Sequence, residues 1–289
     1  MIPIQMCEFA VNDQFSLGTS AGPVAWAANR SPRSAINGRE VVIVDQESGE
    51  TIIRRLRQQD DTLTITSTAR RDSQWSWLER TFRPHSQDAP WADPVIAALA
   101  ERFTGLHSYT DGSLFNGLVT SIVGQSISIA SAMAVQRRLA MSFHDGVEID
   151  GHLMSPLPTA DDLAGATLEL IRASGVTWKR AEGLQAIARE ALAGNLPSGD
   201  DDDLDAITRE LVKLPIVGPW TAASALLWGV GAADAWPKGD VALLRAARLA
   251  YDRDGMTMRE LDALAETWRP YRAIAARLLW TGLLGPGWE

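Results

Sequence analysis

Short apolar runs and alternating patterns characterise the first ninety positions of the chain. Residues 40–45 (EVVIVD) form a short apolar run, and residues 62–66 (TLTIT) alternate apolar side chains with threonine. The polar segments 45–50 (DQESGE) and 59–61 (QDD) supply turn-forming residues beside them. The pattern predicts a partly antiparallel sheet that contains hairpins, followed by a helix over about 73–81.

From Asp93 onward the apolar positions recur at helical spacing. Leu114, Leu118 and Ile122 are four residues apart, and Ile129 and Met133 continue the pattern. Such spacing places the side chains on one face of a helix. Further helices are predicted over 161–173, over 179–192, over 204–213 with Asp203 as N-cap, over 257–268 with a Thr257–Glu260 capping box, and from Pro270 to Leu283.

Pro84, Pro90 and Pro94 interrupt the pattern between these two regions. A chain of 289 residues is long enough for two domains that share an interface. We therefore predict an α+β fold. A mixed α/β N-terminal domain (residues 1–88) would pack on an all-helical region (residues 89–289).

The overall charge argues against a nucleic-acid partner, but the acidic residues are unevenly distributed. The net charge is −9, whereas phosphate binding favours lysine and arginine. Residues 200–203 are four consecutive aspartates, which we interpret as a solvated loop and helix cap. Residues 204–289 contain 10 Lys and Arg against 10 Asp and Glu, so a local basic surface is compatible with the composition.

Cysteine content and hydropathy exclude several classes of protein. Cys7 is the only cysteine, so an intramolecular disulfide or a four-cysteine metal site within one chain is excluded. No apolar run reaches the roughly 20 residues that span a bilayer, and the N-terminal residues do not resemble a secretory signal. We expect a cytoplasmic protein that does not bind membranes.

The segment LVKLPIVGPWTAASALL (residues 211–227) predicts two helices joined by a tight turn. Pro215 and Gly218 favour the turn, and Pro219 suits the first turn of the second helix. The backbone N–H groups at such a helix start form an anion site, and a nucleic-acid phosphate could bind there without basic side chains. The alternative is an ordinary helical hairpin that binds nothing.

Asp240 lies twenty residues beyond Trp220, in the segment DAWPKGDVALLRAAR (residues 234–248). Pro237 and Gly239 predict a loop, so Asp240 opens the following amphipathic helix. An aspartate there is commonly only an N-cap. A carboxylate held at a helix start can also stabilise positive charge that develops on a sugar, or activate a water.

Four segments, in this order, resemble the helix-hairpin-helix DNA glycosylase superfamily. More narrowly, they resemble the bacterial inducible alkylpurine (3-methyladenine type II) DNA glycosylases. Together the segments cover roughly residues 90–289. They are FNGLVTSIVGQSISIA (115–130), KRAE (179–182) with the helix that follows it, LPIVGPWTA (214–222), and WPKGD (236–240) with WRPYRAIAARLLW (268–280).

The resemblance implies that Asp240 is the catalytic residue. Trp220 and Trp280 match positions that face the base pocket of the family. Ser224 and Val241 occupy pocket positions where relatives have aromatic residues, which implies a more open pocket. Trp220 also stands where bifunctional members have a lyase lysine. This implies a monofunctional hydrolase that forms no Schiff base with the sugar.

The resemblance also implies a DNA-binding surface on the hairpin. Backbone groups around Leu214, Ile216, Gly218 and Thr221 match the phosphate clamp, although Ile216 replaces a glycine that is usual in the family. Members of the family often hold a monovalent cation there, which in this chain would bind the backbone carbonyls of Leu214 to Gly218. We expect no other cofactor and no metal site made of side chains.

Gln125, Ser126 and Ile127 lie in the loop that matches the DNA-probing loop of the family. Ser126 stands where a relative can carry a large apolar wedge that fills the stack after the base leaves. Serine is a poor wedge. The role would therefore fall to Gln125 or Ile127.

The expected function is to flip alkylated purines, of the 3-methyladenine and 7-methylguanine type, out of double-stranded DNA and to hydrolyse their N-glycosyl bond in base excision repair. A positively charged base is already a good leaving group, so one carboxylate and aromatic walls would suffice. We expect a monomer in the bacterial cytoplasm, associated with the nucleoid when it acts.

Three alternatives remain open from the sequence. The chain could be a non-catalytic helix-hairpin-helix protein that binds DNA or recognises damage. It could be a glycosylase for deaminated or oxidised bases, which the residues at Ser126, Ser224 and Val241 suggest. The acidic isoelectric point also fits a helical protein with no role on DNA.

Overall fold

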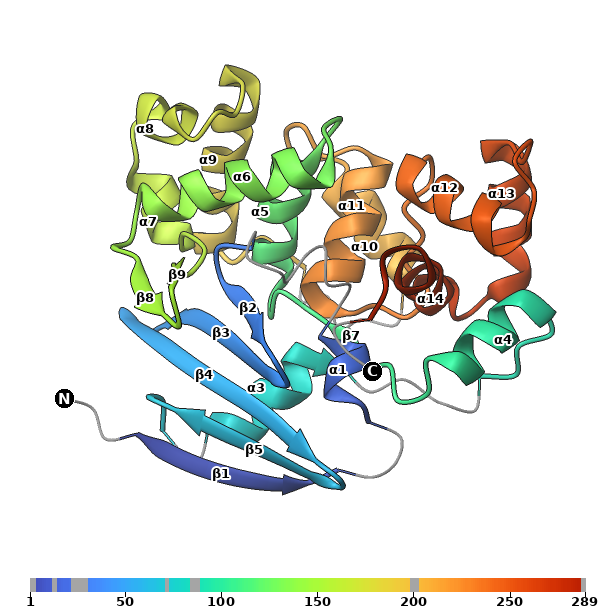
Figure 1. The fold of residues 1–289 in the computed structure, drawn as a ribbon. Coiled ribbons are helices and arrows are strands. Elements are labelled where there is room, and N and C mark those ends of the chain that lie inside the picture. The colour runs from blue at the N-terminus through green and yellow to red at the C-terminus, as the bar shows by residue number, and fades with distance from the viewer. Residues whose placement is uncertain are drawn as a thin grey trace.

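A five-stranded antiparallel sheet forms most of the N-terminal region, with the strand order β1-β5-β4-β3-β2 (Figure 1). The computed structural model describes residues 4–11, 15–21, 31–70, 73–83, 89–197 and 203–286. The strands are β1 (Gln5–Ala10), β2 (Ser34–Asn37), β3 (Glu40–Glu47), β4 (Glu50–Gln59) and β5 (Thr62–Ser67), and two small two-stranded sheets pair β6 (Phe82–Arg83) with β7 (Ser108–Tyr109) and β8 (Val147–Ile149) with β9 (His152–Met154).

The predicted turn at 45–50 is a two-residue hairpin. Glu47 pairs with Glu50, and Ser48 and Gly49 between them have φ values of 50° and 83°. Positive φ at both loop residues matches the right-handed twist of the flanking strands. The hairpin prediction for this segment is confirmed.

Both faces of the sheet are covered, which explains why β3 is apolar at consecutive positions. Val41 and Ile43 face a core that includes residues of α1 (Leu17–Ser20) and α3 (Gln74–Thr81). Val42 and Val44 point the other way and pack against the hairpin β8–β9 of the helical region. Alternate strand residues face opposite sides, so an apolar run is typical of a strand buried on both faces.

The remaining chain is mainly helical, as predicted, and its helices share one hydrophobic core to which α5 contributes (Figure 1). None of the helices in the described part of the chain combines the length and the apolar character needed to cross a membrane. The helices are α4 (Pro94–Arg102), α5 (Leu114–Gly124), α6 (Ile129–Met141), α7 (Ala160–Gly165), α8 (Leu168–Ala173), α9 (Trp178–Leu192), α10 (Leu204–Leu211), α11 (Pro219–Ala225), the π-helical turn η2 (Leu226–Val230), α12 (Val241–Ala250), α13 (Met258–Ala265), the 3-10 turn η3 (Glu266–Trp268) and α14 (Arg272–Leu284).

Two of the predicted helices differ from the structure. The segment 161–173 is two helices, α7 and α8, because the Thr167 side chain accepts a hydrogen bond from the amide of Leu170 and caps a new helix. The last helix begins at Arg272 and not at Pro270, because the amide of Tyr271 bonds to the carbonyl of Trp268 at 2.7 Å and closes a turn first.

Glycines bring α5 directly against the hairpin helices. A Cβ atom on Gly117 would lie 2.5 Å from the carbonyl oxygen of Ala225, and one on Gly229 would lie 2.6 Å from that of Ser113. Only residues without a side chain allow this backbone approach. The contact sets the position of α11 and η2, which carry the tryptophans described below.

The α+β fold class predicted from the sequence is confirmed by the five-stranded sheet and the helical region. Residues 84–88, where the predicted domain boundary falls, and Asp200 to Asp202 of the aspartate run lie outside the described residues. Asp203 is the N-cap of α10 as predicted, and its carboxylate accepts a hydrogen bond from the amide of Ala206.

Candidate active site

The hairpin between α10 and α11 turns at Ile216, which has a φ of +58°. This left-handed conformation is unfavourable for a β-branched residue, and it explains why glycine would suit the position. The Ile216 side chain lies over Gly183 of α9, where an added Cβ would approach its Cδ1 atom to 2.3 Å. The bare backbone of Gly183 therefore makes room for the isoleucine in the hairpin.

The start of α11 exposes backbone amides, as the sequence predicts for a phosphate site. The first helical hydrogen bond is the one from the amide of Ala222 to the carbonyl of Gly218, at 2.9 Å. The amides of Trp220 and Thr221 precede it and so point out of the helix end. Pro219 has no N–H group, which removes one donor from this end.

Gln125 ties the loop after α5 to the hairpin. Its Nε2 atom donates to the carbonyl of Ile216 at 3.0 Å and to Oγ1 of Thr221 at 2.9 Å. Its own carbonyl accepts a hydrogen bond from the Arg180 guanidinium of α9. The side chain of Gln125 is therefore directed inward. Ser126, with a φ of +55°, and Ile127 are exposed at the tip of the loop.

Asp240 is the N-cap of α12, and its carboxylate has two fixed partners. Oδ1 accepts from the amide of Leu243 at 2.8 Å, and Oδ2 accepts from the indole Nε1 of Trp220 at 3.0 Å. The residue is half-buried. Both oxygens are held, so the carboxylate has one orientation relative to α11.

Asp240 lies in the wall of a cavity of about 760 Å³. Trp220, Ser224, Val241 and Trp280 also line it, so the structure brings all the predicted pocket residues together with the predicted catalytic one. Gln125, Ser126 and Ile127 line its rim. The predicted hairpin residues Leu214, Ile216, Gly218 and Thr221 are not among the residues that line the cavity, and they lie beside it in the hairpin.

Trp228 also lines the cavity, and it was not among the residues predicted from the sequence. Its ring centroid lies 5.2 Å from that of Trp280 with an interplanar angle of 30°. The guanidinium of Arg277 lies 4.4 Å from the centroid of the Trp228 ring. Burial lowers the pKa of Arg277 to about 9, and the charge of Asp111 opposes this change. Trp228 belongs to η2, and its sequence context resembles that of a core tryptophan.

A polar wall of the cavity comes from residues outside the predicted site. Arg33 and Asp111 line the cavity and form an ion pair at 3.2 Å. Oδ2 of Asp111 accepts from the hydroxyl of Thr120 at 2.9 Å, and its amide donates to the carbonyl of Trp228 at 2.7 Å. Burial raises the pKa of Asp111, although Arg33 and Thr120 act in the opposite direction.

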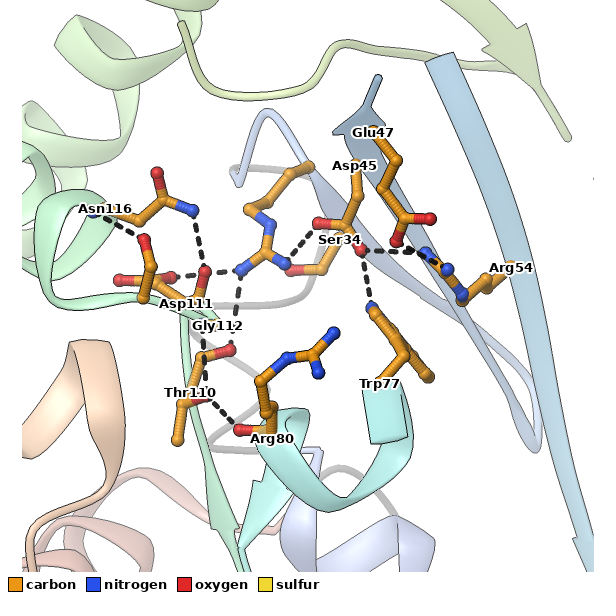
Figure 2. Close-up of polar contacts among 12 residues, drawn as sticks. Ser34, Asp45, Glu47, Arg54, Trp77, Arg80, Thr110, Asp111, Gly112 and Asn116 are labelled. Carbon is orange, nitrogen blue, oxygen red and sulfur yellow. Dashed lines mark hydrogen bonds and ion pairs between the residues drawn. The ribbon is translucent and has the colours of Figure 1, made fainter. Parts of the chain in front are cut away.

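Arg33 also binds Asp45 of β3 and so links the cavity to the sheet. Figure 2 shows Asp45 beside Arg54 and Trp77; the indole of Trp77 donates to it at 2.9 Å, and Arg54 pairs with it at 3.3 Å. Burial raises the pKa of Asp45, but Arg33 and Arg54 outweigh that effect and hold the pKa below its usual value. No local signal in the sequence identifies this network, because its members are distant along the chain.

The described residues offer no cluster of three or more His, Cys, Asp or Glu side chains that could hold a metal ion. In the hairpin, the carbonyl of Leu214 accepts from the amide of Val217 at 3.2 Å, and that of Ile216 accepts from Gln125. Each carbonyl oxygen has a second lone pair, so the hairpin remains compatible with a monovalent cation. The cation stays a prediction.

Sequence comparison identifies DNA-3-methyladenine glycosylases as relatives, and no protein-family model matches the chain. The chain is 31% identical over 171 residues to DNA-3-methyladenine glycosylase 2 of Escherichia coli K12, over 59% of this chain and 57% of that protein. It is 25% identical over 210 residues to DNA-3-methyladenine glycosylase of Bacillus subtilis 168, over 72% and 69% of the two chains. The alignment thus spans less than two thirds of the E. coli relative.

Solved structures share nearly the whole fold. The 3-methyladenine DNA-glycosylase from Archaeoglobus fulgidus has a TM-score of 0.78 at 18% identity, over 95% of this chain and 97% of that one. The Clostridium acetobutylicum 8-oxoguanine glycosylase/lyase, in complex with double-stranded DNA containing cytosine opposite 8-oxoG, has a TM-score of 0.74 at 14% identity, over 96% of both chains. The resemblance inferred from the sequence motifs is therefore confirmed: the chain has the fold of these proteins and is similar in sequence to the 3-methyladenine glycosylases.

Proposed function

We propose that this chain is a monofunctional DNA glycosylase that flips alkylated purines out of double-stranded DNA and hydrolyses their N-glycosyl bond. One observation carries the proposal. The carboxylate of Asp240 is held at a helix N-terminus in the wall of a cavity lined by three tryptophans, Trp220, Trp228 and Trp280. The names of the sequence relatives support the same activity and the same class of base.

The cavity supplies a binding mode for a flat, positively charged base. A base within duplex DNA is inaccessible and must leave the stack. A cationic base over an indole gains about 0.5–2 kcal/mol. Trp220 and Trp280 offer indole rings in the cavity wall, whereas the Trp228 ring already contacts Trp280 and the Arg277 guanidinium. A purine alkylated at a ring nitrogen therefore binds better than its uncharged parent.

Asp240 then acts on the sugar. As the bond to the base breaks, the electron pair leaves with the base and positive charge develops on the sugar. The fixed carboxylate of Asp240 stabilises this charge. It can also accept a proton from the attacking water. Trp220, which donates to this carboxylate, offers no amine, so the mechanism forms no Schiff base and has no lyase step.

The hairpin and the loop after α5 contact the DNA. The amides at the start of α11 bind a phosphate, assisted by a monovalent cation on the hairpin carbonyls. Ile127 is the candidate wedge, because it is 38% exposed at the loop tip while the Gln125 side chain is bonded inward. We expect the protein to act as a monomer in the cytoplasm.

A second substrate class is favoured by the polar wall. Arg33 and Asp111 offer a donor and an acceptor inside the cavity, and an oxidised or deaminated purine carries a carbonyl beside an N–H group. Ser224 and Val241 leave more room than aromatic residues would. The protein could therefore also release uncharged lesions.

Base-release profiling tests the proposal. Duplexes that carry 3-methyladenine, 7-methylguanine, hypoxanthine or 8-oxoguanine are incubated with wild type and with Asp240→Asn. Asp262→Asn is a matched control, because Asp262 accepts a bond from the indole of Trp236 at the same 3.0 Å but does not line the cavity. We expect release by wild type and the control, loss in Asp240→Asn, and no borohydride-trapped adduct. Absence of release by wild type from every duplex would refute the proposal, whereas DNA binding alone would favour a non-catalytic protein.

A further inference from the structure

We propose that Gln136, on α6, reads the hydrogen-bonding edge of the base held in the cavity. It would restrict the substrates to purines that present an N–H donor beside an acceptor. The inference rests on the proposed function, because it concerns the base that the same cavity holds.

Gln136 is a buried residue whose carboxamide has no hydrogen-bond partner in the described part of the chain and borders the cavity. The residue is 6% exposed. By contrast, the fully buried Gln74 donates to the carbonyl of Arg70 at 2.8 Å and accepts from Arg54 at 3.0 Å. Side-chain polar groups of buried residues are usually paired, so an unpaired carboxamide that borders a cavity indicates a ligand.

Ser121 provides an independent observation on the neighbouring helix α5. Its hydroxyl is buried, lines the same cavity and has no hydrogen-bond partner within the described ranges. Asp111, whose side chain is 16% exposed, adds a carboxylate that lines the same cavity. Three polar groups thus face one space, and two of them are free to bind what enters.

These groups and the reaction centre come from different parts of the helical region. Gln136 and Ser121 belong to α6 and α5, whereas Asp240 caps α12 and Trp280 belongs to α14. Figure 1 shows α5 and α6 on one side of α11, and α12 and α14 on the other. A flat base that stacks on the tryptophans can therefore present its outer edge toward α5 and α6.

The chemistry of a carboxamide matches that edge. Glutamine carries a donor and an acceptor side by side, and this pair binds the N7 and N6–H₂ groups of adenine in two parallel bonds. The O6 and N1–H groups of guanine and hypoxanthine present an equivalent pair. A base such as 1,N6-ethenoadenine, whose exocyclic nitrogen is closed into a ring, has lost the donor. Gln136 would therefore favour purines that keep this donor and acceptor pair over 1,N6-ethenoadenine.

The sequence of α6 offers no packing reason for glutamine at this position. Its buried neighbours on the helix are Ala132, Val135, Leu139 and Ala140. A leucine at position 136 would complete this apolar face and would not leave polar atoms unpaired. The substitution Gln136→Leu therefore removes the carboxamide, and we expect it to leave the stability of the fold nearly unchanged.

The test compares wild type, Gln136→Leu and the control Gln185→Leu. Gln185 on α9 donates to the carbonyl of Ala166 at 2.7 Å and does not line the cavity, so its variant reports the effect of the same change on the fold. Three measurements are made. They are kcat/KM for release of 3-methyladenine, Kd for a duplex with a tetrahydrofuran abasic-site analogue that holds no base, and quenching of tryptophan fluorescence by free 3-methyladenine and free 1,N6-ethenoadenine.

We expect Gln136→Leu to lower kcat/KM about ten- to hundredfold, as loss of a bidentate contact predicts. Its Kd for the abasic duplex should stay within about twofold of wild type. Quenching by free 3-methyladenine should weaken, and quenching by ethenoadenine should not. Unchanged kcat/KM, or an equal loss of abasic-site binding, would overturn the inference. If wild type releases no base, the proposed function fails. The quenching measurements then test by themselves whether Gln136 contacts the base: equal quenching by 3-methyladenine in wild type and Gln136→Leu would overturn the inference.

Discussion

The indole Nε1 atom of Trp220 donates a 3.0 Å hydrogen bond to Oδ2 of Asp240, although the two residues stand twenty positions apart and begin different helices. The bond joins the hairpin helix α11 to the carboxylate that caps α12. The orientation of Asp240 therefore depends on where α11 lies relative to α12. Trp220 therefore has two roles: its ring lines the cavity, and its indole N–H positions the carboxylate of Asp240.

We predict that Trp220→Phe lowers the single-turnover rate of base release by about tenfold. The phenyl ring keeps an aromatic wall, but one charge-assisted hydrogen bond is lost, and such a bond contributes about 1.5–3 kcal/mol. The matched control is Trp236→Phe, which removes the equivalent 3.0 Å bond to Asp262 outside the cavity. Equal rates in both variants would show that the Trp220 bond does not position the catalyst.

We predict that Arg33→Ala lowers the free energy of unfolding by about 3–5 kcal/mol, because it leaves the carboxylates of Asp45 and Asp111 buried without this partner. The side chains involved are 5%, 15% and 16% exposed. Urea unfolding measures the change. Arg57→Ala is the control, since Arg57 is 69% exposed in its pair with Glu40 and should contribute less than about 1 kcal/mol. A similar small effect in both variants would contradict a structural role for the Arg33 network.

We predict that Ile127→Ala lowers base release from duplex DNA by about tenfold, because the apolar side chain that would fill the vacated stack is lost. The variant Ser126→Ala, at the adjacent exposed position, should have little effect. Release should be compared between a paired lesion and the same lesion in single-stranded DNA. A wedge is needed only for the paired lesion, so an equal loss on both substrates would argue against this role.

Asp93 is predicted to make stability depend on acid pH. It caps α4 and accepts hydrogen bonds from the hydroxyl of Tyr251 at 2.6 Å and the indole of Trp268 at 3.1 Å. Burial raises the pKa of Asp93, but these bonds outweigh it, so its pKa lies below the usual 3.8. The stabilisation is therefore fully present above that value and is lost as the pH falls through the lower folded-state pKa.

The measurement is urea unfolding of wild type and Asp93→Asn at pH 7 and at successively lower pH. The difference in unfolding free energy should be about 1–2 kcal/mol at pH 7 and should shrink below about pH 4. Asp203→Asn changes an N-cap that is 61% exposed and bonds a single amide, and it should give a smaller difference. A difference that does not vary with pH would contradict the assignment.

The sequence by itself determined the local elements of this protein. The hairpin at 45–50, the capping box of Thr257 and Glu260, and the N-cap at Asp240 all follow from residues within a few positions of each other. Backbone conformational preference and short-range hydrogen bonds decide such features. The resemblance carried by the ordered motifs then pointed to Asp240, Trp220 and Trp280 as members of one site.

Only the tertiary structure decided what else surrounds that site. Arg33 meets Asp111 across 78 positions, and Gln136 faces the cavity instead of solvent although its neighbours at 137 and 138 are arginines. These positions depend on how closely whole elements pack, as where the bare backbones of Gly117 and Gly229 let α5 meet the hairpin helices. Pairing over such separations is set by the packing of the complete core and leaves no periodicity or spacing in the sequence.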